Sequence, residues 1–254
     1  MSEPIFFLHI PKCGGSSIVE AIKHCYVTWA NIAEHDLFQL SAPASFQAAS
    51  KLKSNLQNSY LANDFATLKL REQLLLYYMC QNAKYISGHF PFSQTAYDSF
   101  GDRYKFITIL RDPVKRCVST YFYNRYKTNK HCKIEMGIEE YLNSELGRQT
   151  GRVYVNFLGG ADEKGDYSDA GAINRAKENL HKFSLVGCLE CLEDFERLFA
   201  ARFGRNLKIR VLNQNPKPKS EREAILSEEI KEKIAEICQP DIEIYQYALD
   251  TIIC

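Results

Sequence analysis

The chain has 254 residues, of which 45% are hydrophobic and 25% charged, a composition typical of a globular protein with a sizeable core. Its 32 Lys and Arg residues nearly balance 31 Asp and Glu residues, and the net charge of +1 argues against a generally basic nucleic-acid-binding protein. No run approaches about 18 consecutive apolar residues, and no basic segment leads an apolar run near Met1. We therefore expect a cytoplasmic protein with neither a signal peptide nor a membrane anchor.

Cysteine usage supports that location. Nine cysteines, an odd number, are scattered along a chain too long to need disulfide bonds for its stability. Cys188 and Cys191 form one CxxC motif, but no second pair follows at the spacing of a zinc site, so we interpret it as structural.

The first predicted element is a strand at residues 5–10, whose continuous apolar run is typical of a strand buried on both faces of a parallel sheet. Residues 11–15 end it. Ser16 or Ser17 can then cap a helix with apolar residues at 18, 19 and 22. Residues 28–58 are polar and weakly patterned, which predicts little regular structure. Residues 59–82 carry apolar residues at helical spacing.

Two short strands are expected at residues 84–87 and 104–110. Directly after the second, Asp112 is placed to cap a helix and Pro113 to occupy its first turn, so a helix is predicted to run through residues 114–126.

Further helices are predicted near residues 135–146, 169–181 and 190–203, with possible strands at 183–186 and 207–212. A proline-containing loop should follow at 213–219, and one or two charged helices at 220–252. This alternation favours an α/β fold with a mainly parallel sheet flanked by helices. We expect a single domain over residues 1–254, with 28–82 as a variable, partly helical insertion.

Polar residues follow three of the predicted strands, where parallel α/β sheets bind their ligands. The segment 12–17 reads KCGGSS: Gly14 and Gly15 permit a sharp turn and close approach of an anion, and the helix start and Lys12 supply positive charge. The alternative is a tight turn with a capping serine. The lysine precedes the glycines, unlike the GxxxxGK[ST] loop, which weakens the case for a triphosphatase or kinase.

Two segments together resemble a known family. Residues 9–17, HIPKCGGSS, resemble the HIPKTGGT[ST] segment of carbohydrate sulfotransferases, and residues 110–121, LRDPVKRCVSTY, resemble that family's second signature. The nearest likeness is to the heparan and chondroitin sulfate 2-O-sulfotransferase group and its bacterial relatives. The resemblance implies the sulfotransferase fold, in which the parallel sheet is P-loop-like, and the donor 3′-phosphoadenosine 5′-phosphosulfate.

The resemblance also implies roles for individual residues. Lys12 would act on the bridging oxygen of the donor, and the residues around the 5′-phosphate would be Cys13, Gly14, Gly15, Ser16 and Ser17. Arg111 and Ser119 would hold the 3′-phosphate. An arginine fork suits a phosphate that is never transferred, and a lysine suits an oxygen on which negative charge grows. Outside this context Arg111 would be an ordinary surface charge and Ser119 an ordinary helix serine.

Residues 85–90, YISGHF, resemble the family segment that carries the catalytic histidine, which makes His89 the candidate general base. Taken alone, His89 would be interpreted as a structural histidine, as we interpret His9. No cluster of His, Cys and carboxylate residues suggests a metal, and we expect none.

Downstream the likeness weakens. Residues 185–190, LVGCLE, and 213–218, NQNPKP, resemble late family segments, but residues 152–160 read RVYVNFLGG and lack the expected Gln-Thr-Arg core. Contacts to adenine or acceptor carried by residues 150–160 and 213–218 therefore cannot be assigned, and no match is found for residues 28–82.

The predicted activity is transfer of a sulfuryl group to a hydroxyl of a carbohydrate or other hydroxylated metabolite, possibly an anionic glycan. Two alternatives stay open: a P-loop kinase of a small metabolite, and a non-catalytic protein that binds anionic glycans on the same scaffold. The sequence names neither the acceptor nor the oligomeric state.

The small net charge conceals one basic segment. Residues 103–133 contain nine Lys or Arg residues and a single acidic residue, Asp112. A strongly charged helix is usually a solvated face, but this one starts at the proposed 3′-phosphate site. It could draw in a polyanionic donor, an effect that salt should screen.

Overall fold

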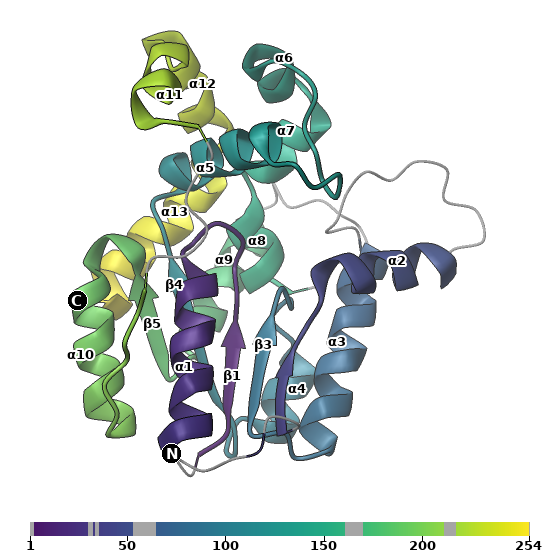
Figure 1. The fold of residues 1–254 in the computed structure, drawn as a ribbon, viewed down its shortest axis with the longest axis vertical. Helices are drawn as coiled ribbons and strands as arrows, with labels where there is room; N and C mark the ends of the chain where they lie inside the picture. The colour runs from purple at the N-terminus through teal and green to yellow at the C-terminus, as the bar shows by residue number, and fades with distance from the viewer. Residues whose placement is uncertain are drawn as a thin grey trace.

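The computed structural model describes residues 3–29, 33, 36–52, 65–160, 170–210 and 217–253, and its centre is a five-stranded sheet with every strand parallel (Figure 1). The strand order is β2-β3-β1-β4-β5. The strands are β1 (Ile5–Leu8), β2 (Leu37–Gln39), β3 (Tyr85–Gly88), β4 (Lys105–Leu110) and β5 (Leu185–Cys188). The predicted α/β class with a parallel sheet flanked by helices is confirmed.

β1 lies at the centre and fixes the register of its neighbours. Phe6 pairs with Ile86 of β3 on one side and with Phe106 of β4 on the other. All four residues of β1 are fully buried, and the ring of Phe6 meets that of Phe106 edge to face at 5.0 Å. Because the three strands are parallel and in register, their carboxyl ends lie side by side.

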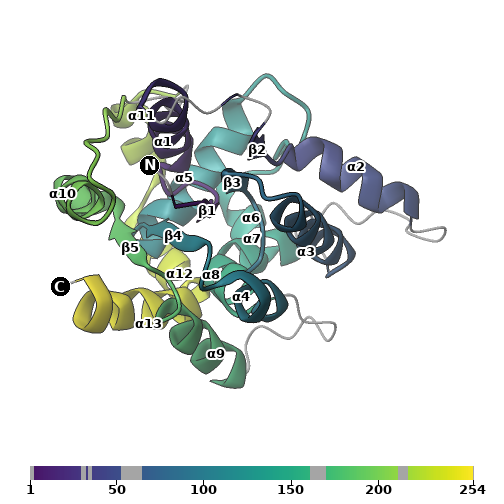
Figure 2. The same ribbon diagram turned by 90° about the horizontal axis from the view of Figure 1, so that it is seen from below.

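Helices cover both faces of the sheet (Figure 2). One face carries α1 (Gly15–Trp29) and α10 (Leu192–Phe203), and the other carries α3 (Phe65–Cys80), α4 (Gln94–Phe100), α9 (Ala170–Leu180) and α13 (Gln239–Ala248). No helix of the described residues is long and apolar enough to cross a membrane.

A group of helices lies beyond the carboxyl ends of the strands, at the top of Figure 1. Its members are α5 (Pro113–Tyr126), α6 (Ile138–Asn143), α7 (Glu145–Thr150), α8 (Val153–Leu158), α11 (Lys219–Ile225) and α12 (Glu228–Ile237). A second apolar cluster joins several of them, with Phe122, Tyr141 and Ile234 fully or almost fully buried. α5 begins as predicted, since Asp112 accepts a hydrogen bond from Lys115 N at 2.8 Å and Pro113 is the first helical residue.

Three expectations about secondary structure were wrong. Residues 28–58 are not largely irregular, because β2 pairs with β3 at the sheet edge and α2 (Ala42–Leu52) follows it. A three-residue edge strand is too short to show periodicity. Residues 207–210 form no strand, while 211–216 lie outside the described residues. The segment 220–252 holds α11, α12, α13 and a final π-helical turn at Leu249–Ile253 instead of one or two helices. α4 and α8 were not predicted.

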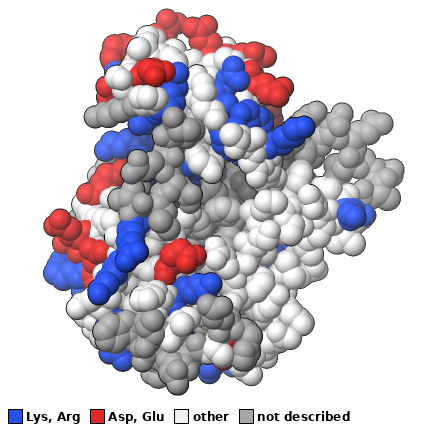
Figure 3. All heavy atoms as spheres, viewed as in Figure 1, with Lys and Arg blue, Asp and Glu red and all other residues white. Residues whose placement is uncertain are grey.

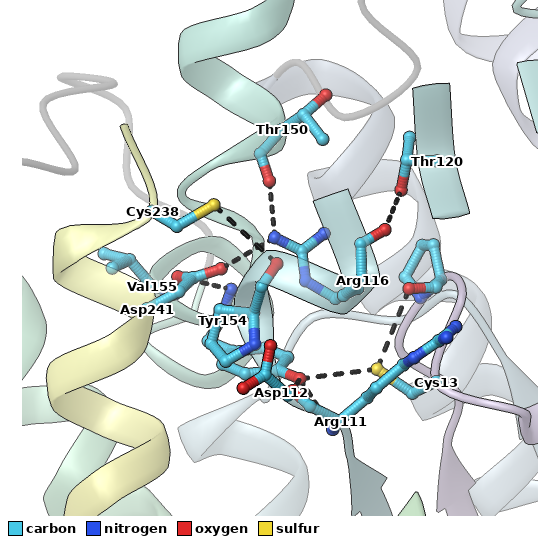
Figure 4. Close-up of polar contacts among 12 residues, drawn as sticks. Cys13, Arg111, Asp112, Arg116, Thr120, Thr150, Tyr154, Val155, Cys238 and Asp241 are labelled. Carbon is cyan, nitrogen blue, oxygen red and sulfur yellow. Dashed lines mark hydrogen bonds and ion pairs between the residues drawn. The ribbon is translucent and has the colours of Figure 1, made fainter. Parts of the chain in front are cut away.

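One buried carboxylate ties three helices together (Figure 4). Arg116 of α5 donates through Nη2 to Asp241 Oδ2 of α13 at 3.0 Å, and both side chains are fully buried. Asp241 Oδ1 accepts from the backbone N–H groups of Tyr154 and Val155 in α8, at 2.9 and 3.2 Å. The same Arg116 nitrogen donates to the carbonyl of Thr150 at the end of α7.

Burial opposes this ion pair. Desolvation raises the pKa of Asp241 to about 6, although Arg116 and the backbone donors lower it. At neutral pH the carboxylate remains charged and fully engaged. Among the described residues Arg116 forms a salt bridge with Asp241 alone, so loss of Asp241 would leave a buried guanidinium without a counter-ion.

We expect Asp241→Asn to lower the free energy of unfolding by about 3–5 kcal/mol, because the amide cannot neutralise Arg116 and turns a donor toward it. Urea denaturation measures the change. Asp250→Asn, at an exposed position of the same C-terminal segment, is the matched control and should stay within about 0.5 kcal/mol. A loss below about 1 kcal/mol for Asp241→Asn would contradict the assigned role.

Candidate active site

The loop between β1 and α1 has the backbone of an anion cradle. Lys12 has φ +65° and Gly14 φ +76°, and α1 begins directly afterwards at Gly15. Ser17 N donates to Gly14 O at 3.2 Å, which closes the turn. The first backbone N–H groups of a helix have no partner within it, and its dipole favours negative charge there. The loop can therefore bind an oxyanion with main-chain donors.

Both glycines are required by close packing. A Cβ on Gly14 would lie 2.6 Å from Leu189 Cδ1, and one on Gly15 would lie 2.1 Å from His9 Cδ2. The positive φ of Gly14 adds a conformational reason. The imidazole of His9 therefore packs directly against the start of α1.

Lys12 carries a positive charge that no carboxylate of the described residues pairs with. Its Nζ lies 3.5 Å from the centre of the Tyr123 ring, on α5. Burial lowers the pKa of Lys12 to about 8, with further contributions from the positive charges of Arg111 and Lys127. Among the described residues no salt bridge includes Lys12. An anion is the missing partner.

Arg111 follows β4 and is anchored mainly through its main chain. Its Nη1 donates to Lys12 O at 3.0 Å, which joins it to the loop. Its backbone N–H donates at 2.8 Å to the hydroxyl of Tyr154, which in turn donates to the carbonyl of Arg111 (Figure 4). Its Nε is buried without a partner in the described part of the chain. A buried, unsatisfied N–H is costly, so this atom too is available to an anion.

Cys13 faces away from the cradle. Its side chain is fully buried, and its Sγ lies 3.5 Å from the Tyr154 hydroxyl. Burial raises the pKa of the Cys13 thiol to about 11, so the thiol is neutral. Any contact of Cys13 with an anion must therefore use its backbone N–H.

His89 follows β3 and has a fixed tautomer. Its Nδ1 lies 2.6 Å from the carbonyl oxygen of His9. Since a carbonyl only accepts, Nδ1 must carry the proton, and Nε2 keeps its lone pair. Burial lowers the pKa of His89 to about 4, against the raising effect of that hydrogen bond. The imidazole is neutral at physiological pH and can accept a proton.

Arg71 of α3 holds the other side of the histidine. Its side chain is 1% exposed, and its Nη1 donates to His89 O at 3.0 Å while its Nε donates to Ser45 Oγ at 3.0 Å. The charge of Arg71 and that of His131 both lower the pKa of His89 further. His131 therefore lies close enough to the site to act on it electrostatically.

Ser119 occupies a half-buried position on α5. It precedes Tyr123 by four residues, so the serine and the ring that contacts Lys12 share one face of the helix. This face is directed to the same loop.

The structure brings together the residues that the sequence placed at three strand ends. Direct contacts join the loop of Lys12 to Arg111, and the main chain of His9 to His89. Sequence reasoning missed Tyr154, which lies where residues 152–160 depart from the family pattern. It also missed the tie of Arg116 to Asp241, since a basic residue on a helix carries no local sign that its partner is 125 residues away.

The basic segment 103–133 does not form one continuous patch. Carboxylates lie near three of its cations, at 3.6 Å for Lys105 and Glu3, 3.8 Å for Lys115 and Glu190, and 3.0 Å for Arg116 and Asp241. On the face shown in Figure 3, acidic side chains gather at the outer end of the upper helices and basic ones lie nearer the middle of the molecule. The total of nine basic residues therefore overstates the positive charge of this segment that is free to meet a ligand.

No group of three or more His, Cys, Asp or Glu side chains that could hold a metal ion occurs in the ranges described above. The donor set at the three strand ends consists of ammonium, guanidinium and N–H groups, which suits an anion.

We expect Gly15→Ala to push the His9 ring away, because its Cβ would overlap that ring. The cost should be about 1–3 kcal/mol of folding free energy, and binding of a phosphate-bearing ligand should weaken at the same time. Urea denaturation and calorimetric titration measure the two effects. Gly137→Ala is the control, since nothing lies within 4 Å of its added Cβ. Equal behaviour of both variants would contradict the packing argument.

The comparison with known families agrees with this arrangement. The model described as "Sulfotransferase family" matches residues 2–206, a range that contains all five strands, the loop of Lys12, His89 and Arg111. No curated protein sequence gives a significant match. Because the matched range covers well over half of the chain, this protein belongs to the sulfotransferase family.

Proposed function

We propose that the protein transfers a sulfuryl group from 3′-phosphoadenosine 5′-phosphosulfate to a hydroxyl group of an acceptor. The observation that carries the proposal is the meeting, at adjacent strand ends, of an anion cradle with unpaired cations and a neutral histidine with a free Nε2. Family membership makes sulfuryl transfer the leading chemistry for such a site.

The residues present suit the donor. The N–H groups of Cys13, Gly14, Gly15, Ser16 and Ser17, together with Lys12, would hold the 5′-phosphosulfate. Arg111 and Ser119 would hold the 3′-phosphate. Support comes from the buried Arg111 Nε and the Lys12 ammonium, which have no partner and no counter-ion within the described part of the chain and which an anionic ligand would satisfy.

The donor supplies an activated sulfur–oxygen bond, and the protein supplies proton transfer and charge stabilisation. His89 Nε2 removes the proton of the acceptor hydroxyl as its oxygen forms a bond to sulfur. The bond between sulfur and the bridging oxygen breaks, and adenosine 3′,5′-bisphosphate leaves with that electron pair. Lys12 and the loop N–H groups stabilise the charge on the departing oxygen. General base catalysis by His89 should contribute roughly 10²–10⁴-fold.

Positioning accounts for much of the expected rate enhancement. His89 is held between the carbonyl of His9 and the guanidinium of Arg71. Arg111 is held by Tyr154 and the carbonyl of Lys12. The groups that face the ligand therefore need little rearrangement to engage it.

Several finer parts of the proposal rest on the sequence. Residues 9–17 favour a place near the heparan and chondroitin sulfate 2-O-sulfotransferases and their bacterial relatives. The acceptor would be a carbohydrate, such as an anionic glycan, or another hydroxylated metabolite. We also propose that residues 1–254 form one domain. The odd number of scattered cysteines supports a further proposal, a cytoplasmic location. Screening acceptor pools with a donor carrying labelled sulfate would identify the acceptor.

Calorimetric titration separates this function from a kinase. We expect tight binding of adenosine 3′,5′-bisphosphate and weak binding of ATP with Mg²⁺, because Arg111 and Ser119 are placed for a 3′-phosphate. Lys12→Ala should weaken bisphosphate binding about 10-fold or more. His89→Ala should leave binding intact and abolish most labelled sulfate transfer. Preferential binding of ATP would overturn the proposal, and a His89→Ala enzyme with near-normal turnover would exclude His89 as the base.

The pH profile tests the same assignment. Because burial lowers the pKa of His89 to about 4, the base stays unprotonated well below the usual value near 6.5. Lys12, with a pKa of about 8, loses its charge as the pH rises through that value. We expect kcat/KM for the donor to be nearly flat from about pH 5 to pH 7.5, falling on either side. An acid limb between pH 6 and 7 would contradict the assignment to His89.

A further inference from the structure

Lys127 is a second lysine beside the ring that Lys12 contacts. It is the first residue after α5, and its Nζ lies 5.6 Å from the centre of the Tyr123 ring, the ring against which Lys12 packs at 3.5 Å. Its ammonium donates to Asn124 Oδ1 at 2.7 Å, and its carbonyl accepts from Lys133 Nζ. The residue is partly buried, with its side chain bound by Asn124 and its main chain by Lys133.

Two ammonium groups beside one aromatic ring are electrostatically unfavourable unless an anion compensates their charge. Like charges repel, and the charge of Lys127 is among the causes that lower the pKa of Lys12. Burial also lowers the pKa of Lys127. The polar partner of Lys127 in the described residues is the neutral amide of Asn124, and neither lysine takes part in a salt bridge there. The ligand-free protein holds an uncompensated pair of cations, which an anion between them would relieve.

The position of Lys127 along α5 indicates which part of the ligand it meets. Ser119, Tyr123 and Lys127 follow one another at four-residue spacing, so they lie along one side of the helix. At 1.5 Å per residue, Lys127 lies about 12 Å beyond Ser119 and away from Arg111. The loop that Lys127 opens leads to His131, whose ring contacts that of Phe46 on α2. The neighbouring Ser45 accepts a hydrogen bond from Arg71, which also donates to the carbonyl of His89. Lys127 is therefore at the end of the site where acceptor and sulfur meet.

We propose that Lys127, together with Lys12, binds a sulfate-type oxyanion beyond the 5′-phosphate position. This inference rests on the proposed function. The oxyanion is either the sulfuryl group of the donor or an anionic substituent of the acceptor, since both present the same tetrahedral or planar oxygen geometry to an ammonium. Tyr123 serves as a positioning residue, because both ammonium groups lie within about 6 Å of the centre of its ring.

Lys127→Gln tests the proposal, since it removes the charge but keeps a polar side chain of similar length. Lys130→Gln is the matched control: it removes the same charge three residues further along, at an exposed position. Each protein is saturated with adenosine 3′,5′-bisphosphate, which fills both phosphate positions, and binding of radiolabelled inorganic sulfate is measured by equilibrium dialysis. Thermal unfolding of both variants confirms that they fold like the parent protein.

We expect sulfate to bind the wild-type and Lys130→Gln complexes and to bind the Lys127→Gln complex about 10- to 100-fold more weakly, the usual effect of losing a charged hydrogen-bond donor. Repeating the dialysis with 3′-phosphoadenosine 5′-phosphosulfate identifies the source. Exclusion of free sulfate assigns the site to the sulfuryl group of the donor, and retained binding assigns it to an anionic acceptor.

Equal sulfate binding by the Lys127→Gln and wild-type complexes would overturn the inference, as would absence of sulfate binding to a wild-type complex that does hold the bisphosphate. Failure of the wild-type protein to bind the bisphosphate at all would instead refute the proposed function. A second pair of variants tests the ring: Tyr123→Phe should keep sulfate binding because the aromatic face remains, and Tyr123→Leu should weaken it. Full retention by Tyr123→Leu would remove Tyr123 from the site.

Discussion

The buried carboxylate of Asp241 is the contact on which the geometry of the site depends. It neutralises Arg116 and accepts a hydrogen bond from the backbone N–H of Tyr154. The hydroxyl of Tyr154 in turn forms hydrogen bonds with the main chain of Arg111 and the thiol of Cys13. A tyrosine held at its backbone and at its hydroxyl is a rigid spacer. Asp241 lies outside the matched range 2–206, so α13 adds contacts that help to position residues within that range.

The contacts that join the parts of the site run from side chains to main-chain atoms of neighbouring strand ends. The carbonyl of His9 fixes the tautomer of His89, and the carbonyl of Lys12 receives the guanidinium of Arg111. The geometry of these contacts follows from the parallel register of β3, β1 and β4. Buried apolar residues specify the register of the sheet, and the register sets the distances between the polar groups at the strand ends. Packing of the core therefore also determines the geometry of the site.

Local signals explain how much the sequence could predict. The apolar run of β1, the glycines of its loop and the Asp112-Pro113 helix start each act within a few residues, and each was recognised. Strand β2 has only three residues, so its two apolar side chains, Leu37 and Phe38, are too few to show a strand period although both pack against the core. Arg116 resembled a solvated charge, because a sequence gives the spacing of a residue on its own helix but not what that face meets. Long-range partners such as Asp241 are invisible at that level.

The same reasoning changes the meaning of a net charge near zero. Carboxylates lie near Lys105, Lys115 and Arg116, whereas Lys12 and Lys127 have none in the described part of the chain. Selective pairing leaves the positive charge where the strands end, so the local field there does not depend on the total. Uncompensated, partly buried cations lower the stability of the free protein, and a bound polyanion raises it by mass action. Ligand binding and folding are therefore coupled at this site through the charges that the protein leaves unpaired.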